Sequence, residues 1–179
     1  MVTRARVVLV PMLACLLCSS ASAQATWVAM NPPTSPSARV GHKMAFDSLR
    51  GRVVLFGGST ASGLSGETWE WDGSTWTMVS NTGPAARWMH AMTYDSRRGR
   101  VVMLGGAPAD TATWEWDGST WSAVASGPAG SMPSMAFDSV RGQVVLFGAG
   151  ETWEWDGSTW TQASTTPPVF GLNQGALAF

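Results

Sequence analysis

One internal repeat occurs three times in this chain of 179 residues, and it limits the possible folds more than any other feature. A nine-residue string, TWEWDGSTW, is found at 68–76, 113–121 and 152–160. Each copy follows a second shared string, namely MAFDSLRGRVVLFGG at 44–58, MTYDSRRGRVVMLGG at 92–106 and MAFDSVRGQVVLFGA at 135–149. Such self-similarity predicts stacked structural units that bury their apolar faces against one another.

The repeat divides into four short strands, described here for its first copy. Met44–Phe46 alternates large and small side chains, and Arg52–Phe56 is the apolar run expected of a strand covered on both faces. Thr68–Trp71 alternates Trp with Glu, and the hairpin signal Asp72-Gly73 connects it to Thr75–Val79. No segment has a helical period. A period of 45 and then 39 residues, measured between the first Trp of each copy, is close to that of propeller blades. We therefore predict an all-β chain of blades, each with four antiparallel strands.

These residues resemble the repeats of bacterial secreted kelch-type β-propellers, including those of galactose-oxidase central domains. The resemblance rests on Gly-Gly after an apolar strand, on Trp after a D-x-x-x-W turn, and on a preceding Arg-x-x-His, and it covers about residues 26–179. In the third repeat Gly148-Ala149 replaces Gly-Gly, and Gly130 and Pro133 replace Arg and His. The resemblance implies a propeller that binds or scaffolds more often than it catalyses. The predicted structural positions of the repeat are Gly57, Gly58, Trp69, Trp76, Gly105, Gly106, Trp114, Trp121, Trp153 and Trp160.

Residues 1–23 have the pattern of a secretory signal peptide. Two arginines precede the apolar stretch Val7–Cys18, which is shorter than the 20 or so residues of a membrane span, and Ala21-Ser22-Ala23 is a cleavage motif. We predict a secreted or periplasmic protein that begins at Gln24 and contains no Cys. A lipoprotein modified at Cys15 is the less favoured alternative, because the preceding residues match such sites poorly.

The repeat also predicts the organisation of the chain. The expected segments are a signal peptide at 1–23, an outer strand and linker at 24–38, blades at 39–80, 81–124 and 125–164, and the start of a truncated fourth repeat at 165–179. Trp27 matches the outer-strand Trp76, and Ala178-Phe179 matches Ala45-Phe46, so three complete repeats have partial ones on either side. We expect either a fragment of a longer propeller, which we favour, or a propeller whose open blade faces are covered by self-association.

Comparison of the repeats predicts where a ligand binds. The turns after strands one and three are nearly constant, whereas the connections after strands two and four vary in length and content. The varying connections are Ser59–Gly66, Ala107–Ala112, Ala149-Gly150, Met30–Ala38, Ser80–Ala86 and Ala125–Ser131. Residues that the fold requires are expected to be the same in every repeat, so variation confined to one end of the blades indicates a recognition surface.

Four candidate ligand-binding residues lie beside the varying connections: Arg39, Arg87, Trp88 and His90. Arg would pair with carboxylates or hydroxyls, and Trp would stack on a sugar or an aromatic ring. The alternative, favoured for the Arg and His residues, is that Arg39 and His42, repeated as Arg87 and His90, bond loop carbonyls where the first strand begins. Trp88 fits both interpretations, since no repeat position explains it.

Known catalytic constellations are poorly supported. A copper oxidase needs a Tyr–Cys pair with further Tyr and His ligands, whereas the predicted mature chain has no Cys, one Tyr and two His. We predict no metal, no cofactor and no enzymatic activity, although calcium at the DGST turns of Asp72, Asp117 and Asp156 is left open. The remaining carboxylates of the repeat, at Glu70, Glu115 and Glu154, are interpreted as solvent-facing or Arg-paired.

Two functional hypotheses follow. The first is a secreted, non-catalytic module that binds a protein or a glycan through its variable connections. The alternative is the N-terminal portion of a larger secreted enzyme, an oxidase- or glycosidase-like propeller whose catalytic residues lie elsewhere. The formal net charge of −1 argues against a nucleic-acid partner, and no membrane span is predicted.

Overall fold

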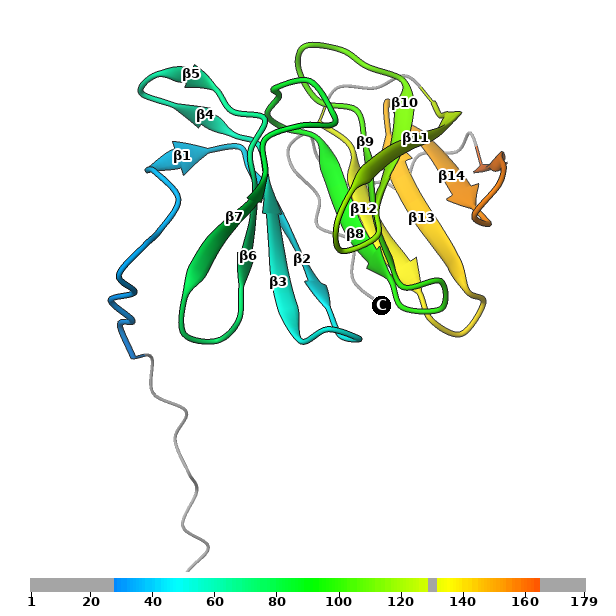
Figure 1. Ribbon diagram of the computed structural model, residues 1–179. Helices are drawn as coiled ribbons and strands as arrows, with labels where there is room; N and C mark the ends of the chain where they lie inside the picture. The colour runs from blue at the N-terminus through cyan, green and yellow to red at the C-terminus, as the bar shows by residue number, and fades with distance from the viewer. Residues whose placement is uncertain (1–27, 129–131, 165–179) are drawn as a thin grey trace, which may run out of the picture. The chain divides into compact units, whose positions relative to one another are not determined.

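The computed structural model describes residues 28–128 and 132–164, which form strands joined by turns and loops (Figure 1). The chain divides into two units, Met1–Met30 and Asn31–Phe179, and every described strand belongs to the second. These strands form four antiparallel sheets, of which three have four strands each. The all-β prediction is therefore confirmed. The predicted signal peptide, Trp27 and the predicted fourth repeat lie outside the described residues.

Each complete repeat forms one four-stranded sheet, and we call these sheets blades 1, 2 and 3. Blade 1 consists of β2 (Lys43–Asp47), β3 (Arg52–Phe56), β6 (Thr68–Trp71) and β7 (Trp76–Ser80). Blade 2 consists of β8 (Ala91–Asp95), β9 (Arg100–Leu104), β10 (Ala112–Trp116) and β11 (Trp121–Ser126). Blade 3 consists of β12 (Ser134–Asp138), β13 (Gln143–Gly148), β14 (Glu151–Trp155) and β15 (Trp160–Ser164). The strands expected for the first repeat match those of blade 1 to within one residue at each end.

The three blades also share their register. In each, the pairing between the third and fourth strands shifts at one place, between Thr68 and Trp69 in blade 1 and at the equivalent positions of the other two. A shift of this kind is a β-bulge, which bends a strand and re-aims its side chains. The three identical TWEWDGSTW strings therefore form the same β-bulge in all three blades.

A fourth, small sheet was not expected from the sequence. It joins β1 (Arg39–Val40) to β4 (Ser59–Thr60) and β5 (Gly63–Leu64), the last two being a hairpin within the connection 59–66. The hairpin turns at Ala61-Ser62 and is followed by Gly63 with a positive φ, and the hydroxyl of Thr60 donates to the carbonyl of Gly63 and accepts the N–H of Ser62. Strands of two residues leave no alternation to detect, which is why this sheet was missed.

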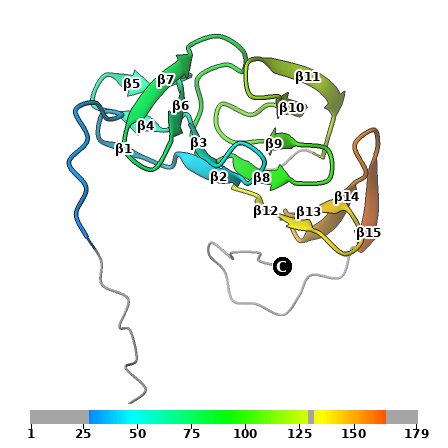
Figure 2. The same cartoon turned by 60° about the horizontal axis from the view of Figure 1, so that its bottom comes forward.

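The blades pack face to face through two hydrophobic cores. The first strands β2, β8 and β12 lie side by side, with β8 in the middle, and each sheet extends away from them (Figure 2). Between blades 1 and 2, Val54 and Phe56 pack against residues that include Trp116 and Trp121, and the ring centroids of Phe56 and Trp121 are 5.3 Å apart. Between blades 2 and 3, Trp155 is fully buried in the equivalent place. Large aromatic side chains of this kind contribute most of the apolar area that such interfaces bury.

Hydrogen bonds from indole groups connect each blade to the one before it. Trp116 Nε1 donates to Glu70 Oε1 at 3.2 Å, and Trp121 Nε1 donates to Thr68 Oγ1 at 2.8 Å. The next interface repeats both bonds with the same lengths, from Trp155 to Glu115 and from Trp160 to Thr113. A hydrogen bond to a charged group contributes about 1.5–3 kcal/mol, so the bonds to the carboxylates are the stronger members of each pair.

The carboxylate that accepts the indole is also held within its own blade. Arg50 donates from Nη1 to Glu70 Oε1 and from Nε to Asp47 Oδ2, both at 2.7 Å, and Arg98 bridges the equivalent acids of blade 2. The interpretation of these Glu residues as Arg-paired is confirmed. The alternative that they face solvent is wrong for Glu70 and Glu115, which are each 8% exposed because the following blade covers them.

The glycine of the DGST turn completes this contact. A Cβ at Gly118 would lie 2.8 Å from Nε of Arg50, which belongs to the preceding blade, whereas a Cβ at the equivalent Gly73 would meet nothing within 4 Å. Both glycines have a positive φ, of 101° and 99°. Replacing either glycine therefore imposes the same backbone strain. Only at Gly118 does the added side chain also meet a residue of the neighbouring blade.

We expect Gly118→Ala to lower the free energy of unfolding more than Gly73→Ala, by about 1–3 kcal/mol, because only at 118 must the partly buried guanidinium of Arg50 move. Urea denaturation followed by tryptophan fluorescence would measure both variants. Equal losses would show that the contact between Gly118 and Arg50 does not contribute to stability.

Candidate binding surface at the variable-loop end

The two ends of the blades differ in how they are built. The turns at 48–51 and 72–75 of blade 1, with their equivalents in blades 2 and 3, form what we call the constant-turn end (Figure 1). The connections after the second and fourth strands lie at the opposite end, the variable-loop end, which also carries β1, β4 and β5. The predicted separation of constant from variable connections is therefore present in three dimensions.

The aspartates of the DGST turns, at the constant-turn end, accept hydrogen bonds from groups of their own turns. Asp117 Oδ1 accepts the backbone N–H groups of Ser119 and Thr120 at 2.8 Å, and the Ser119 hydroxyl donates to the same oxygen. The bond from the Thr120 N–H, followed by those from Ser119, lowers the pKa of Asp117 to about 2. Asp72 and Asp156 make the same backbone bonds. Within residues 28–128 and 132–164, no group of three or more His, Cys, Asp or Glu side chains is placed to hold a metal ion.

At the variable-loop end, Arg39 and Arg87 hold loops together from below the surface. The Arg39 side chain is 3% exposed and donates to the carbonyl of Gly57 at 2.9 Å, and Arg87, at 2%, donates to the carbonyl of Gly105 at 3.2 Å. The expectation that both arginines bond loop carbonyls is thus confirmed. The guanidinium groups of Arg39 and Arg87 are therefore both inaccessible to a ligand in this arrangement.

Each arginine also pairs with an acid that the sequence analysis did not single out. Arg39 contacts Glu67 at 2.8 Å, and Arg87 contacts Asp110 at 2.7 Å. The same carboxylates accept the indole N–H of the third-strand tryptophans, Trp69 and Trp114. Because Arg39 donates to Glu67, the pKa of that carboxyl lies below its ordinary value. The signal that could have revealed the first of these acids is its position two residues before Trp69.

The backbone of Arg87 connects blade 2 to the loop of blade 1. Its carbonyl accepts the N–H of Gly58 at 2.9 Å, and its N–H donates to the carbonyl of Ser65 at 3.2 Å. A Cβ at Gly57 would lie 2.5 Å from that same carbonyl oxygen. Gly-Gly is therefore required here by the close approach of the next repeat, beyond ending β3.

His90 is buried and packs as a neutral ring. Its side chain is 0% exposed, its ring lies 5.5 Å from that of Phe56 at a steep angle, and neither ring nitrogen has a hydrogen-bond partner among the described residues. Burial, followed by the positive charges of Arg87 and Lys43, lowers the pKa of His90 to about 3. The expectation that this histidine bonds a loop carbonyl is wrong, since apolar contact holds the ring.

Of the four candidate residues, Trp88 is the one with an accessible side chain and a free donor. Its backbone pairs with Ala107 in an isolated bridge, with N–H to carbonyl distances of 3.1 and 2.9 Å. The ring is half-buried and packs on Gly41, where a Cβ would lie 3.1 Å from Cε3. Its indole N–H meets no acceptor in the part of the chain that the structure describes. The structure thus fixes the Trp88 backbone and leaves a polar group of its ring unpaired.

Blade 3 differs from the others at this end. Pro133 stands where blade 2 has His90 and packs against Gly148, and residues 129–131 lie outside the described part. Glu151 accepts the indole N–H of Trp153 at 2.9 Å, but among the described residues no arginine pairs with it. The described residues of blade 3 therefore contain no Arg–acid pair like those that hold the loops of blades 1 and 2.

Comparison with known proteins adds no identification: neither the family models nor the curated proteins match this chain. The resemblance to kelch-type repeats stays a prediction from the repeat residues. Among the described residues, no helix is long and apolar enough to cross a membrane.

The buried His90 predicts acid sensitivity. Unfolded His titrates near 6.5 and folded His90 near 3, so between these values the unfolded chain binds one more proton and the free energy of unfolding falls as the pH falls. From pH 7 to about pH 5.5 this loss is about 1 kcal/mol, while most carboxyl groups are still ionised. We expect His90→Leu to remove most of it in urea titrations at both pH values. His42→Gln is the comparison, because His42 is less deeply buried; an unchanged pH dependence in His90→Leu would contradict the assignment.

Proposed function

We propose that the protein is an exported, non-catalytic binding module of the kelch type, whose ligand is a protein or a glycan. The observation that carries this proposal is the contrast between the two ends of the blades. Backbone bonds fix the constant-turn end in the same way in every blade, whereas the variable-loop end differs from blade to blade in length, charge and anchoring. Surfaces that a fold does not require to be constant are where recognition residues collect.

Trp88 is the proposed contact residue. Its ring is half-buried, its indole N–H is unpaired within the described residues, and its backbone is held by Ala107, so little order is lost on binding. A tryptophan with an apolar ring and one free donor suits both a sugar face and an apolar protein side chain. Arg39, Arg87 and His90 then act by holding the loops around it in place.

The acidic groups at the variable-loop end narrow the chemistry of the ligand. Asp110 and Glu67 remain about one third exposed, at 31% and 37% of their side chains, although each is paired with a buried arginine. Carboxylates of this kind accept hydrogen bonds from hydroxyl groups or pair with cationic side chains. The proposal therefore favours a hydroxyl-rich or basic ligand over an anionic one.

We expect Trp88→Ala to weaken binding by at least about tenfold, the loss typical of a central tryptophan in a binding surface. Affinity electrophoresis against a panel of soluble neutral polysaccharides, with basic and acidic proteins in parallel, would find the ligand and measure the change. Leu49→Ala is the matched control, because Leu49 is 79% exposed at the constant-turn end. Full binding by Trp88→Ala would contradict the proposed surface.

Export is tested separately. If residues 1–23 are a signal peptide, N-terminal sequencing of the protein recovered outside the cytoplasm of a bacterial host will begin at Gln24. Ala23→Leu should block this cleavage, because the site requires small side chains. A recovered protein that still begins at Met1 would contradict the assignment.

A further inference from the structure

Blade 1 has an open face that matches a buried one. We call this the donor face: it is the side of blade 1 away from blade 2, formed by Met44, Phe46, Trp71 and Trp76. Met44 and Phe46 are 51% and 58% exposed, whereas the equivalent Met92 and Tyr94 of blade 2 are 7% and 9% exposed. Because the equivalent side of blade 2 is covered by blade 1, the donor face has the composition of a blade interface with no blade on it among the described residues.

The donor face carries two unpaired indole groups. Trp116 and Trp121 of blade 2 donate to blade 1, but the equivalent Trp71 and Trp76 have no acceptor for their N–H groups within residues 28–128 and 132–164. Their rings lie together, with centroids 5.6 Å apart, as do those of Trp116 and Trp121 at 5.5 Å. The donors are therefore arranged in the open face much as they are in the closed one.

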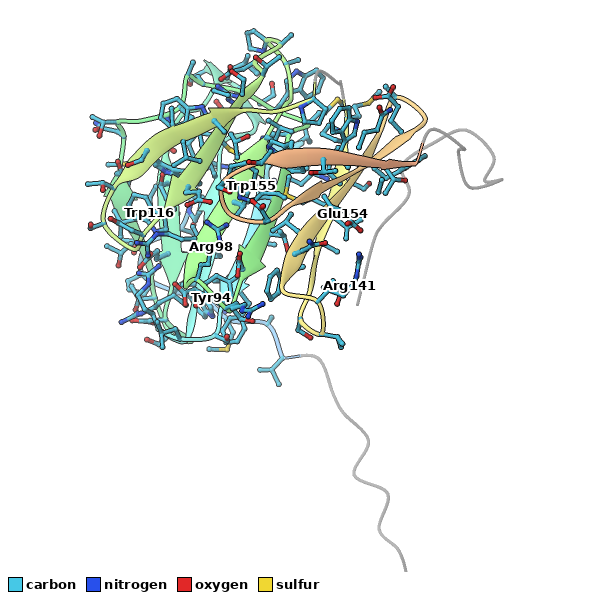
Figure 3. All side chains as sticks on the ribbon, turned by 90° about the vertical axis from the view of Figure 1, so that its right-hand side faces the viewer. Tyr94, Arg98, Trp116, Arg141, Glu154 and Trp155 are labelled. Atoms are coloured by element: carbon cyan, nitrogen blue, oxygen red, sulfur yellow. The ribbon has the colours of Figure 1, made fainter. Side chains whose placement is uncertain are left out.

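Blade 3 has the complementary open face, the acceptor face, formed by Phe147, Thr152 and Glu154. In blades 1 and 2 the equivalent Thr and Glu accept indole N–H groups from the following blade, whereas Thr152 and Glu154 accept none among the described residues. Among the described residues Arg141 is the one hydrogen-bond partner of Glu154, and this pair lies at the margin of blade 3, while Trp116 and Trp155 lie between sheets (Figure 3). The Glu154 side chain is 22% exposed, compared with 10% for its buried equivalents.

We infer that the donor face of one chain binds the acceptor face of a second copy of the same chain. In this contact Trp71 would donate to Glu154 of the second copy and Trp76 would donate to Thr152, repeating the bonds between blades 1 and 2. Two donors and two acceptors match in number, position and order. Phe46 and Met44 would be buried against Phe147 and its neighbours, as Tyr94 and Met92 are buried against blade 1.

The contact joins two different surfaces, so it is head-to-tail. Such a contact either closes into a ring or continues as a filament, depending on the rotation between copies. The three described blades of two copies would give six, which lies within the four to eight blades of known propellers. The assembly inferred is therefore a closed pair of chains joined by two identical contacts.

Sedimentation velocity of the purified protein at several concentrations tests this inference with two blocking variants. Met44→Glu places a charge on the donor face, and Thr152→Lys places one on the acceptor face. We expect the wild type to form a two-chain species and each variant alone to be monomeric. A mixture of the two variants should form a pair again, because each retains the face that the other lacks, though a weaker one with a single contact.

Control variants separate association from folding. Val124→Glu changes an exposed residue of β11 outside both faces and should leave the two-chain species intact. Trp76→Phe removes one donor from each of the two contacts without adding charge and should weaken association about 25-fold, the effect of two hydrogen bonds of about fivefold each. The matched Trp121→Phe removes the equivalent donor inside the chain, so it should lower the unfolding free energy and leave association unchanged.

Three results would overturn the inference. A wild type that stays monomeric at every concentration would mean that something else, such as residues 165–179 of the same chain, covers the faces. A Thr152→Lys variant that still forms pairs alone would indicate a contact between two donor faces. Failure of the two folded blocking variants to associate with each other at the highest concentration reached would exclude a head-to-tail contact. Circular dichroism of each variant establishes that it is folded.

Discussion

The structure depends on a buried carboxylate that needs partners from two repeats. Glu70 accepts from Arg50 in its own blade and from Trp116 in the next, and Glu115 is held in the same way. A buried charge without such partners is strongly unfavourable, so a blade that carries this Glu is complete only when the following indole is in place. Packing of aromatic rings brings the blades together, and the carboxylate determines which faces meet and in which register.

Much of this fold could be predicted from the sequence because its signals are local. The turn residues Asp72-Gly73 and the apolar run Arg52–Phe56 identify strands from neighbouring residues alone, and the threefold repeat identifies the blade. The bond from Trp116 to Glu70 joins residues 46 apart, and no local pattern indicates which face of a blade each side chain occupies. Glu70 was therefore correctly paired with an arginine and incorrectly given a solvent-facing alternative.

The candidate binding surface was predictable as a region and less so in its details. Comparing the repeats located the variable connections, and the carbonyl bonds of Arg39 and Arg87 agree with the structural role weighed for them. Glu67 and Asp110 were missed, because their importance comes from the buried arginines that they pair with. His90 resembles a polar site residue in the sequence, but its position against Phe56 makes it part of the packing. Trp88, which no repeat position explains, is the candidate that keeps an accessible ring.

The separation of indole donors and carboxylate acceptors onto opposite faces of one blade has an evolutionary consequence. Because every repeat carries both halves of the same interface, an in-frame tandem duplication of one repeat would add a blade that already fits both of its neighbours. No compensating substitutions at the junctions would be required. Recombination between such similar segments can therefore change the number of blades in one step, and selection can act afterwards on the variable loops alone.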